Sequence, residues 1–325
     1  MKAIVMHGVG DTSVLAYEEI PTPTPQAHDL LVKVHATALN RCDIIQRQGT
    51  YKVPPSNSPI LGIEIAGEVV ACGDAVTRFQ VGDRVFGYVN GGGYAQYCLQ
   101  DEYFATPLPP QLSYTQGAAI AEVFQTANEA IFTHGKLQKN EILLLNAAAS
   151  GVGTAGIQMA KAIGARVIAL ASTADKLAFC ESLGADCVIN YRTQNFVEAV
   201  KHYTDGRGVD LIVDAVGPDC LDQNIACLKQ EGRLIAIGLL SGIHAEFNFA
   251  AFIAKCAQMK GHNTRGRDLS EQRLISQHFR ERWLSALNEN KIKPIVDKIF
   301  PIEQVALAHQ RMENNLNIGK IVLEL

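Results

Sequence analysis

Short runs rich in apolar and β-branched residues fill the first third of the chain. The clearest runs are residues 29–39, 64–73 and 82–89, and Gly and Pro residues separate them. Such runs are typical of strands, while glycine and proline mark the turns between them. The pattern predicts a twisted, barrel-like antiparallel unit from the start of the chain to about residue 110, with few helices.

From about residue 115 the pattern changes to continuous Val, Ile and Leu runs that alternate with amphipathic segments. The runs are residues 141–147, 166–172, 186–191, 210–217 and 233–240, with 259–264 as a possible sixth, and helical segments include 153–164 and 174–185. Strands that are apolar on both faces predict a parallel sheet covered by helices, in a doubly wound α/β domain.

The end of the chain is expected to return to the first domain. A long polar helix is predicted near residues 268–289, followed by strand, helix and strand at 293–300, 303–312 and 319–325. We therefore expect one domain at 1–121, completed by 290–325, and a second domain at 122–289.

Composition and charge narrow the classes of function. With 325 residues and 47% hydrophobic content, the chain can bury a core in each of two domains. A net charge of −4 without a Lys or Arg run argues against nucleic acid as a partner. No apolar segment reaches the ~18 residues of a membrane span, and the first residues do not resemble a secretory signal. Eight cysteines without a CxxC pair suggest reduced thiols in a cytoplasmic protein.

Residues 143–158 join a strand to a helix through a loop of small residues. The glycine positions of a G-x-G-x-x-G fingerprint fall on Ala148, Ser150 and Gly153, so only the third glycine is retained, although Gly151 adds another. The strand–loop–helix setting favours a pyrophosphate at the helix N-terminus, held by residues Ala148, Ser150, Gly151, Val152 and Gly153. A tight turn without a ligand is the alternative.

The end of the second strand of this unit indicates which dinucleotide is bound. Enzymes that use NAD usually place Asp or Glu there, on the ribose 2′-hydroxyl, whereas this chain has Ala171. Hydroxyl and basic side chains, which suit a 2′-phosphate, follow this position and the third strand: Ser172, Thr173, Lys176, Tyr191 and Arg192. We therefore predict NADPH; a solvated Lys176 beside a neutral turn is the alternative.

Two further strand ends are expected to contact the coenzyme. Ligands of parallel sheets lie at the carboxyl ends of the strands. The fourth and fifth strands end at Val216-Gly217 and Gly238-Leu239. Gly217, Gly238 and Leu239 are therefore predicted coenzyme contacts, unless the glycines are plain strand ends.

The order of these motifs resembles the medium-chain dehydrogenase/reductase superfamily along the whole chain. The stretches "ALNRCDIIQRQGTY", "LGIEIAGEV" and "GGGYAQY" are similar to its zinc-free quinone oxidoreductases, and most similar to their tumour-suppressor-inducible subfamily. The resemblance implies a GroES-like β-barrel catalytic domain beside a Rossmann domain that binds NADPH.

The same resemblance implies that both zinc sites of the superfamily are missing. Asn40 stands at the first ligand position with Asp43 after it, G-H-E is replaced by Gly62-Ile63-Glu64, and no cluster of four cysteines is present. Cys42 lies nearby, but a single thiol is a poor zinc site, and we expect a small buried residue there. No metal is predicted.

By resemblance, three residues surround the substrate. Asn40 can donate a hydrogen bond to a quinone oxygen, Asp43 can orient it or relay a proton, and Tyr51 can stack on the acceptor or bond to it. The alternatives are that Asn40 and Asp43 only cap the turn after a strand, and that Tyr51 only covers the barrel edge. Thr126 is expected at the start of the helix that links the domains, near the nicotinamide amide.

The predicted activity is hydride transfer from NADPH to a quinone or another conjugated electrophile. A quinone spreads the added charge over its ring, so it needs no Lewis acid. An alkenal or enoyl reductase on the same scaffold is the alternative enzyme, with Tyr51 as the proton donor. An NADPH-binding or RNA-associated scaffold is the alternative without catalysis.

Two arginines and three histidines outside these motifs are expected to have no direct part in catalysis. Arg265 and Arg267 could meet an anionic substrate, but we expect two solvated arginines. His244, His262 and His309 are expected to be structural or surface residues. Analogy suggests a homodimer or homotetramer that pairs outer sheet edges, either the strand at 261–266 or its neighbour at 232–240.

Overall fold

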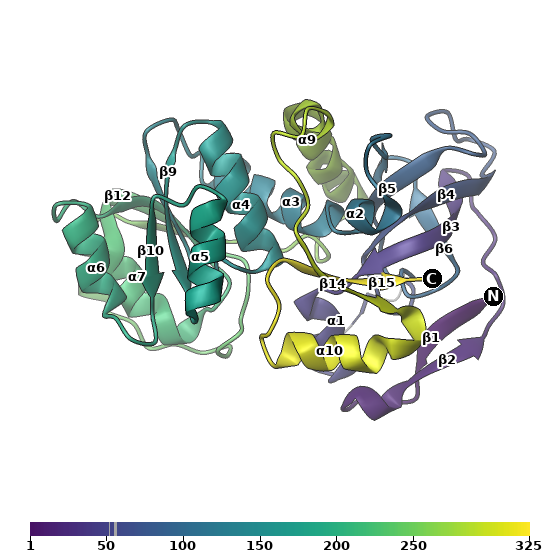
Figure 1. The fold of residues 1–325 in the computed structure, drawn as a ribbon, viewed down its shortest axis with the longest axis horizontal. Helices are drawn as coiled ribbons and strands as arrows, with labels where there is room; N and C mark the ends of the chain where they lie inside the picture. The colour runs from purple at the N-terminus through teal and green to yellow at the C-terminus, as the bar shows by residue number, and fades with distance from the viewer. Residues whose placement is uncertain (52, 55–56) are drawn as a thin grey trace. The chain divides into compact units, whose positions relative to one another are not determined.

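The computed structural model describes residues 1–51, 53–54 and 57–325. By internal contacts the chain divides into two compact units (Figure 1). Unit 1 comprises Met1–Gln125 and Arg265–Leu325, and unit 2 comprises Thr126–Thr264. Each unit has its own sheet.

The main sheet of unit 1 has the strand order β14-β15-β3-β4-β5-β7, and β6 also pairs with β3. All these pairs are antiparallel except β14 with β15. The strands are β3 (Asp29–Ala38), β4 (Glu64–Cys72), β5 (Arg84–Tyr88), β6 (Tyr97–Asp101), β7 (Ala105–Pro107), β14 (Val296–Pro301) and β15 (Lys320–Glu324). A separate hairpin joins β1 (Lys2–Met6) to β2 (Leu15–Glu19). The predicted return of the chain end to this sheet is confirmed by β15, which pairs with β3.

Helices of unit 1 include α1 (Arg41–Arg47), α2 (Tyr114–Ala118), α9 (Leu269–Asn288) and α10 (Val305–Glu313), and α3 (Ala121–Asn128) crosses the boundary to unit 2. We expected α9 in the second domain, but its contacts place it in unit 1. Hydrogen bonds hold α9 to unit 1: Arg273 Nε donates to Asp101 Oδ2 at 3.1 Å, and Arg280 Nη1 donates to the Tyr103 carbonyl at 2.6 Å.

Unit 2 contains the predicted parallel sheet, in the order β10-β9-β8-β11-β12-β13. Its strands are β8 (Ile142–Leu145), β9 (Arg166–Ala171), β10 (Cys187–Asn190), β11 (Val209–Asp214), β12 (Leu228–Ala236) and β13 (Gln258–Gly261). Its helices are α4 (Gly151–Ala162), α5 (Ala174–Ser182), α6 (Phe196–Tyr203), α7 (Leu221–Cys227) and α8 (Phe249–Ala254). The chain runs outward from β8 to β10 and then returns to β11, so right-handed crossovers place helices on both faces. The α/β doubly wound prediction is confirmed.

The outer edge of this sheet differs from both edges suggested by sequence, because β13 (Gln258–Gly261) shares only Gly261 with the suggested strand at 261–266. β12 pairs with β11 on one side and with β13 on the other, so it is not an edge. β13 is the outermost strand, and all four of its residues are exposed. The neighbouring segment also exposes large apolar side chains, at Leu239, Leu240, Ile243, Phe249 and Ile253.

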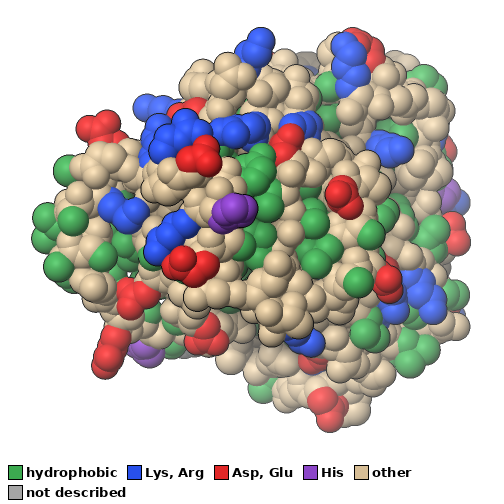
Figure 2. Space-filling model, turned by 60° about the vertical axis from the view of Figure 1, so that its left-hand side comes forward, with side chains coloured by type: hydrophobic (Ala, Val, Ile, Leu, Met, Phe, Trp, Pro, Cys, Tyr) green, Lys and Arg blue, Asp and Glu red, His purple; other side chains and the backbone are tan. Residues whose placement is uncertain are grey.

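Charged side chains of both signs are interspersed on the face of the molecule shown in Figure 2. This distribution accords with the small net charge of the chain. Among the described residues, no helix is both long and apolar enough to cross a bilayer.

Candidate functional site

The loop between β8 and α4 has the geometry of a phosphate cradle. Ser150 caps α4, and its side-chain oxygen accepts a hydrogen bond from the Gly153 N–H at 3.1 Å. A Cβ atom on Gly153 would lie 2.4 Å from the Ala148 carbonyl oxygen, so only glycine allows this close approach. The N–H groups of the first helical turn have no partner within the helix and can bind a phosphate.

The residues predicted to select the dinucleotide lie at the same edge of the sheet. Ala171 is buried at the end of β9, and Thr173 follows it as the N-cap of α5, accepting from the Lys176 N–H at 3.4 Å. Tyr191 follows the end of β10 and is 48% exposed. With small residues in the cradle and no carboxylate at the end of β9, this edge fits NADPH.

A buried polar cluster, which sequence reasoning missed, fixes the loop after β11. Asp214 Oδ1 accepts from the Val216 N–H at 2.7 Å and from Asn146 Nδ2 at 3.0 Å, and its Oδ2 accepts from Asn224 Nδ2 at 3.1 Å. Gly217 then adopts a φ of 92°, which favours glycine. The signal in the sequence was an Asn or Asp at the end of each of two buried strands.

Gly238, Leu239 and Thr126 complete the predicted coenzyme contacts. A Cβ on Gly238 would lie 2.5 Å from the Ala215 carbonyl oxygen, so the chain is tightly packed there, whereas Leu239 is 63% exposed. Thr126 is in the last turn of α3 and not at a helix start, which corrects our expectation. The chain continues beyond α3 as a π-helical segment, so the sequence offers no break at which to place the helix end.

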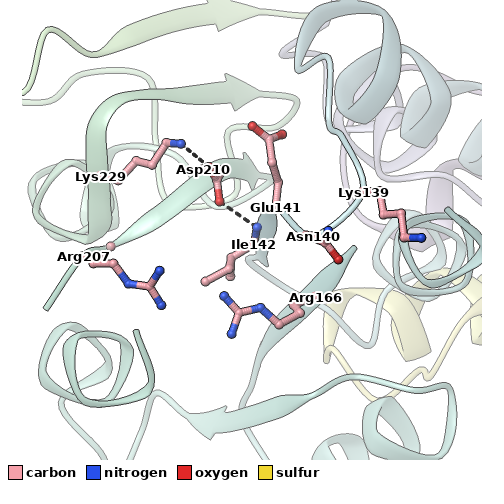
Figure 3. A pocket seen from close by; sticks show the side chains of 9 residues that line it. Lys139, Asn140, Glu141, Ile142, Arg166, Arg207, Asp210 and Lys229 are labelled. Atoms are coloured by element: carbon pink, nitrogen blue, oxygen red, sulfur yellow. Dashed lines mark hydrogen bonds and ion pairs between the residues drawn. The ribbon is translucent and has the colours of Figure 1, made fainter. Parts of the chain in front are cut away.

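The opposite edge of the same sheet carries an open hollow of about 390 Å³ (Figure 3). In Figure 3 the side chains of Arg166 and Arg207 extend into it, while Asp210 is bound to Lys229 and to the Ile142 N–H. These residues lie at the amino ends of the strands. The hollow is therefore separate from the predicted coenzyme edge.

In unit 1, Asn40 belongs to a buried cluster with Glu64 and Lys320. Lys320 Nζ donates to Asn40 Oδ1 at 2.6 Å and to the Leu39 carbonyl at 2.6 Å, and it lies 2.8 Å from Glu64 Oε1. Asn40 Nδ2 donates to the same Glu64 oxygen at 2.8 Å. Its second contact, to the Ala38 carbonyl, is 3.4 Å long, so one amide hydrogen is only weakly held.

This donor set does not fit a zinc ion. The oxygens of Asn40 and Glu64 that face the cluster are bound to the Lys320 ammonium, which already supplies a positive charge. Cys42 is partly exposed and packs beside Ile63 and Tyr88. The apolar surroundings of its thiol raise the pKa of that group well above the usual value. Among the described residues, no three His, Cys, Asp or Glu side chains group as a metal site.

Asp43 ends a chain of hydrogen bonds that crosses the core of unit 1. Its Oδ2 accepts from the Asn40 N–H at 2.8 Å and from the Tyr94 hydroxyl at 3.2 Å. The capping role left open by sequence therefore holds for Asp43, whereas the side chain of Asn40 points to Glu64 and Lys320. Burial raises the pKa of Asp43.

The chain continues from Tyr94 to His309 and Arg47. The Tyr94 oxygen lies 3.3 Å from His309 Nε2, and Arg47 Nη1 lies 3.2 Å from His309 Nδ1. Because arginine only donates, Nδ1 accepts and the proton is assigned to Nε2. His309 is fully buried and thus structural, and Arg47 also binds Glu313 at 2.6 Å.

Tyr51 and Arg265 lie together in unit 1. The Arg265 guanidinium is 5.1 Å from the centre of the Tyr51 ring, and its Nη1 donates to Gln46 Oε1 at 2.9 Å. Arg265 is only 6% exposed, so our expectation of a solvated arginine was wrong. Arg267 is half-buried and pairs with Glu271 at 3.2 Å. Nothing in the sequence near Arg265 signals burial, because its neighbours are polar.

Known proteins resemble the chain from end to end. The family model of the alcohol dehydrogenase GroES-like domain matches residues 26–132, and that of zinc-binding dehydrogenases matches residues 151–277. Quinone oxidoreductase of Rattus norvegicus is 30% identical over 328 residues, which cover 100% of this chain and 98% of the relative.

Solved structures give the same picture. Escherichia coli quinone oxidoreductase complexed with NADPH has a TM-score of 0.91 and 28% identity, with 100% of both chains covered. CurK enoyl reductase has a TM-score of 0.90 and 27% identity, with 99% of this chain and 98% of the other covered. The predicted GroES-like and Rossmann folds are confirmed.

Proposed function

We propose that this chain, which belongs to the quinone oxidoreductase family of the medium-chain dehydrogenases and reductases, is an NADPH-dependent reductase of quinones. The observation that carries the proposal is its full-length similarity to quinone oxidoreductases, one of which is named as a complex with NADPH. The small-residue cradle at Gly153 and the absence of a carboxylate at Ala171 support this coenzyme.

The coenzyme residues are proposed as a set on unit 2. NADPH, when bound, supplies the hydride that the reaction transfers. We assign the pyrophosphate to the first turn of α4, where Ser150 and Gly153 shape the loop. The full proposed set is Thr126, Ala148, Ser150, Gly151, Val152, Gly153, Ser172, Lys176, Tyr191, Gly217, Gly238 and Leu239.

Asn40, Asp43 and Tyr51 are the proposed residues for the acceptor. The weakly held amide hydrogen of Asn40 can turn to a quinone oxygen, while its other hydrogen stays on Glu64. Asp43 acts as a positioning residue, because it holds the Asn40 N–H. Tyr51 can stack on a flat acceptor, or its hydroxyl can donate a hydrogen bond to an acceptor oxygen. Since a quinone delocalises the added charge, we propose that the reaction is independent of zinc.

An alkenal or enoyl reductase is the second candidate. It is favoured by the similarity to CurK enoyl reductase, which covers 99% of this chain. Such a reaction needs a proton donor for the α-carbon of the substrate, and Tyr51 is the residue we assign to it. Substrate preference distinguishes this candidate from the quinone reductase.

The test follows NADPH oxidation by its near-ultraviolet absorbance. The acceptors are an ortho-quinone, a para-quinone and a 2-alkenal, each with and without a chelator, and NADH replaces NADPH in a parallel series. Chelator-resistant, NADPH-selective turnover of a quinone supports the proposal. Turnover of the alkenal alone would transfer the assignment to an alkene reductase, and no turnover with tight NADPH binding would reject both enzymes.

Two variants test the acceptor residues. Asn40→Ala and Tyr51→Phe should each lower quinone turnover by about tenfold or more, the size expected when one hydrogen bond to a reacting group is lost. Tyr114→Phe is the matched control, because Tyr114 lies elsewhere in unit 1, stacked on His35. Full activity in both site variants would remove these residues from the mechanism.

A further inference from the structure

The guanidinium group of Arg265 is buried with part of its hydrogen-bonding capacity unused. The side chain is 6% exposed. Its Nη1 donates to the neutral Gln46 side chain at 2.9 Å, but Nε and Nη2 are buried and have no hydrogen-bond partner among the described residues. Such groups are rare in native proteins, and each one calls for an explanation.

The two unused nitrogens define one edge of the guanidinium plane. The hydrogens of Nε and Nη2 point in the same direction, and this edge is the one that holds a carboxylate through two parallel bonds. Gln46 occupies the other terminal nitrogen, so it leaves the edge open. The bonding geometry therefore suits a planar anion.

No side chain of the described residues supplies that anion. The charge of Arg265 acts on the buried Asp43 carboxylate, but the oxygens of Asp43 already accept from Asn40, Gly62 and Tyr94. The Tyr51 ring stabilises the cation through its face but accepts no conventional hydrogen bond there. A buried charge without a counter-ion is costly, so the site is complete only with an anion from outside the chain.

A second unused donor belongs to the same surroundings. The Tyr88 hydroxyl is buried and has no hydrogen-bond partner among the described residues. Burial raises the pKa of Tyr88 well above its usual value, and the charge of Arg265 opposes that rise, which places the two groups in electrostatic reach. The region thus offers a cation and a neutral donor, and both lack an acceptor.

We propose that Arg265 binds a carboxylate on the acceptor and thereby selects carboxylated quinones over uncharged ones. This inference rests on the proposed quinone reductase function. Tyr51, whose ring lies over the guanidinium and which we place beside the acceptor, connects the carboxylate site to the acceptor site. Because Nε and Nη2 are enclosed in this structure, the side chains around them must move when the carboxylate enters.

The experiment compares a naphthoquinone that carries a carboxylate with the uncharged parent compound. The full-length protein should prefer the carboxylated acceptor by about tenfold or more in kcat/KM, mainly through KM, as a charge-assisted bidentate contact predicts. Arg265→Met, which keeps the side-chain volume, should abolish the preference, and Arg265→Lys should keep part of it. Arg267→Met removes a neighbouring cation and should leave the preference intact.

Direct binding separates this inference from the proposed function. Naphthoate, which cannot accept hydride, should bind the wild-type protein with NADPH present and lose about tenfold or more in affinity in Arg265→Met. Circular dichroism verifies that the variant is folded. Turnover of the uncharged quinone without a preference for the carboxylated one, or equal naphthoate affinity in both proteins, would overturn the inference and leave the quinone reductase standing. Naphthoate binding through Arg265 without quinone turnover would instead reject the proposed function and support the carboxylate site.

Discussion

Lys320 Nζ lies 2.8 Å from Glu64 Oε1, and neither side chain is more than 4% exposed. The pair connects β15, near the end of the chain, to the start of β4. Glu64 Oε2 also accepts from the Glu122 N–H at 2.9 Å. The charge of each residue is thus matched by a partner that lies far away in the sequence, and Asn40 is held between them.

Replacement of Lys320 tests how much this pair matters. Lys320→Met should lower the free energy of unfolding by about 3–5 kcal/mol, because it leaves the Glu64 carboxylate buried without a counter-charge. Urea denaturation measures the loss. The double variant Lys320→Met/Glu64→Leu should recover most of it, and Lys33→Met, on an exposed position of β3, should change stability by no more than about 0.5 kcal/mol. A full-sized loss that persists in the double variant would contradict the explanation.

His309 should make stability depend on pH. Burial, with a smaller contribution from Arg47, lowers the pKa of His309 from 6.5 to about 3. Between these values the unfolded chain binds a proton that the folded protein does not, so stability is present above pH 6.5 and falls as the pH drops toward 3. His309→Gln should flatten this fall by up to about 1.4 kcal/mol per pH unit. Urea midpoints from neutral to acidic pH give the two slopes, and equal slopes would be the contrary result.

The coenzyme preference tests the edge near α5. The double variant Lys176→Ala/Tyr191→Ala should weaken NADPH binding and leave NADH affinity nearly unchanged, because only NADPH carries the 2′-phosphate. A tenfold or greater fall in the ratio of affinities is about the size expected for a lost charge-assisted contact. Fluorescence titration measures both affinities. Lys201→Ala, on the exposed face of α6, is the matched control. An unchanged ratio of NADPH to NADH affinity in the double variant would show that Lys176 and Tyr191 do not bind the 2′-phosphate.

We expect the edge strand β13 to form an interface with a second copy of the chain. The exposed apolar residues that precede β13 would be buried in this interface. Ile243 is 74% exposed and Ile253 is 66% exposed, which is unusual for large apolar side chains near an open sheet edge. We expect a homodimer or a homotetramer by analytical ultracentrifugation. Ile243→Glu/Ile253→Glu should shift the protein toward a smaller species, while Val9→Glu, an exposed apolar residue of unit 1, should not. A monomeric wild-type protein would end this prediction.

Local sequence patterns predicted most of unit 2. The apolar run of β8 predicts a strand buried on both faces of a sheet. The small residues after it predict a tight loop that leads into a helix, because only small side chains fit there. Ala148 and Ser150 therefore lie in the loop before α4, and Gly153 lies in its first turn, in the strand–loop–helix order that the sequence predicts. The position of Thr126 was misjudged because a π-helical segment extends the helical region without a change in composition.

The polar core of unit 1 was harder to foresee. Lys320 lies in an apolar strand, and a charged side chain in such a strand requires a partner when it is buried. The sequence of the strand does not indicate which residue that partner is. Glu64 is its partner across a separation of more than half the chain. Arg265 carries no local mark of burial, since no apolar residue stands beside it in the sequence.

The sequence alone determined the class of fold, the alternation of strands and helices in unit 2, and the loop chemistry suited to a dinucleotide. These features depend on periodicity and on residue size within short segments, which are local properties of the chain. Only the tertiary structure decided that Lys320 neutralises Glu64, that Asp43 is reached from Arg47 through His309 and Tyr94, and that Arg265 is enclosed. Burial and charge pairing join segments far apart in the chain, so no local pattern encodes them.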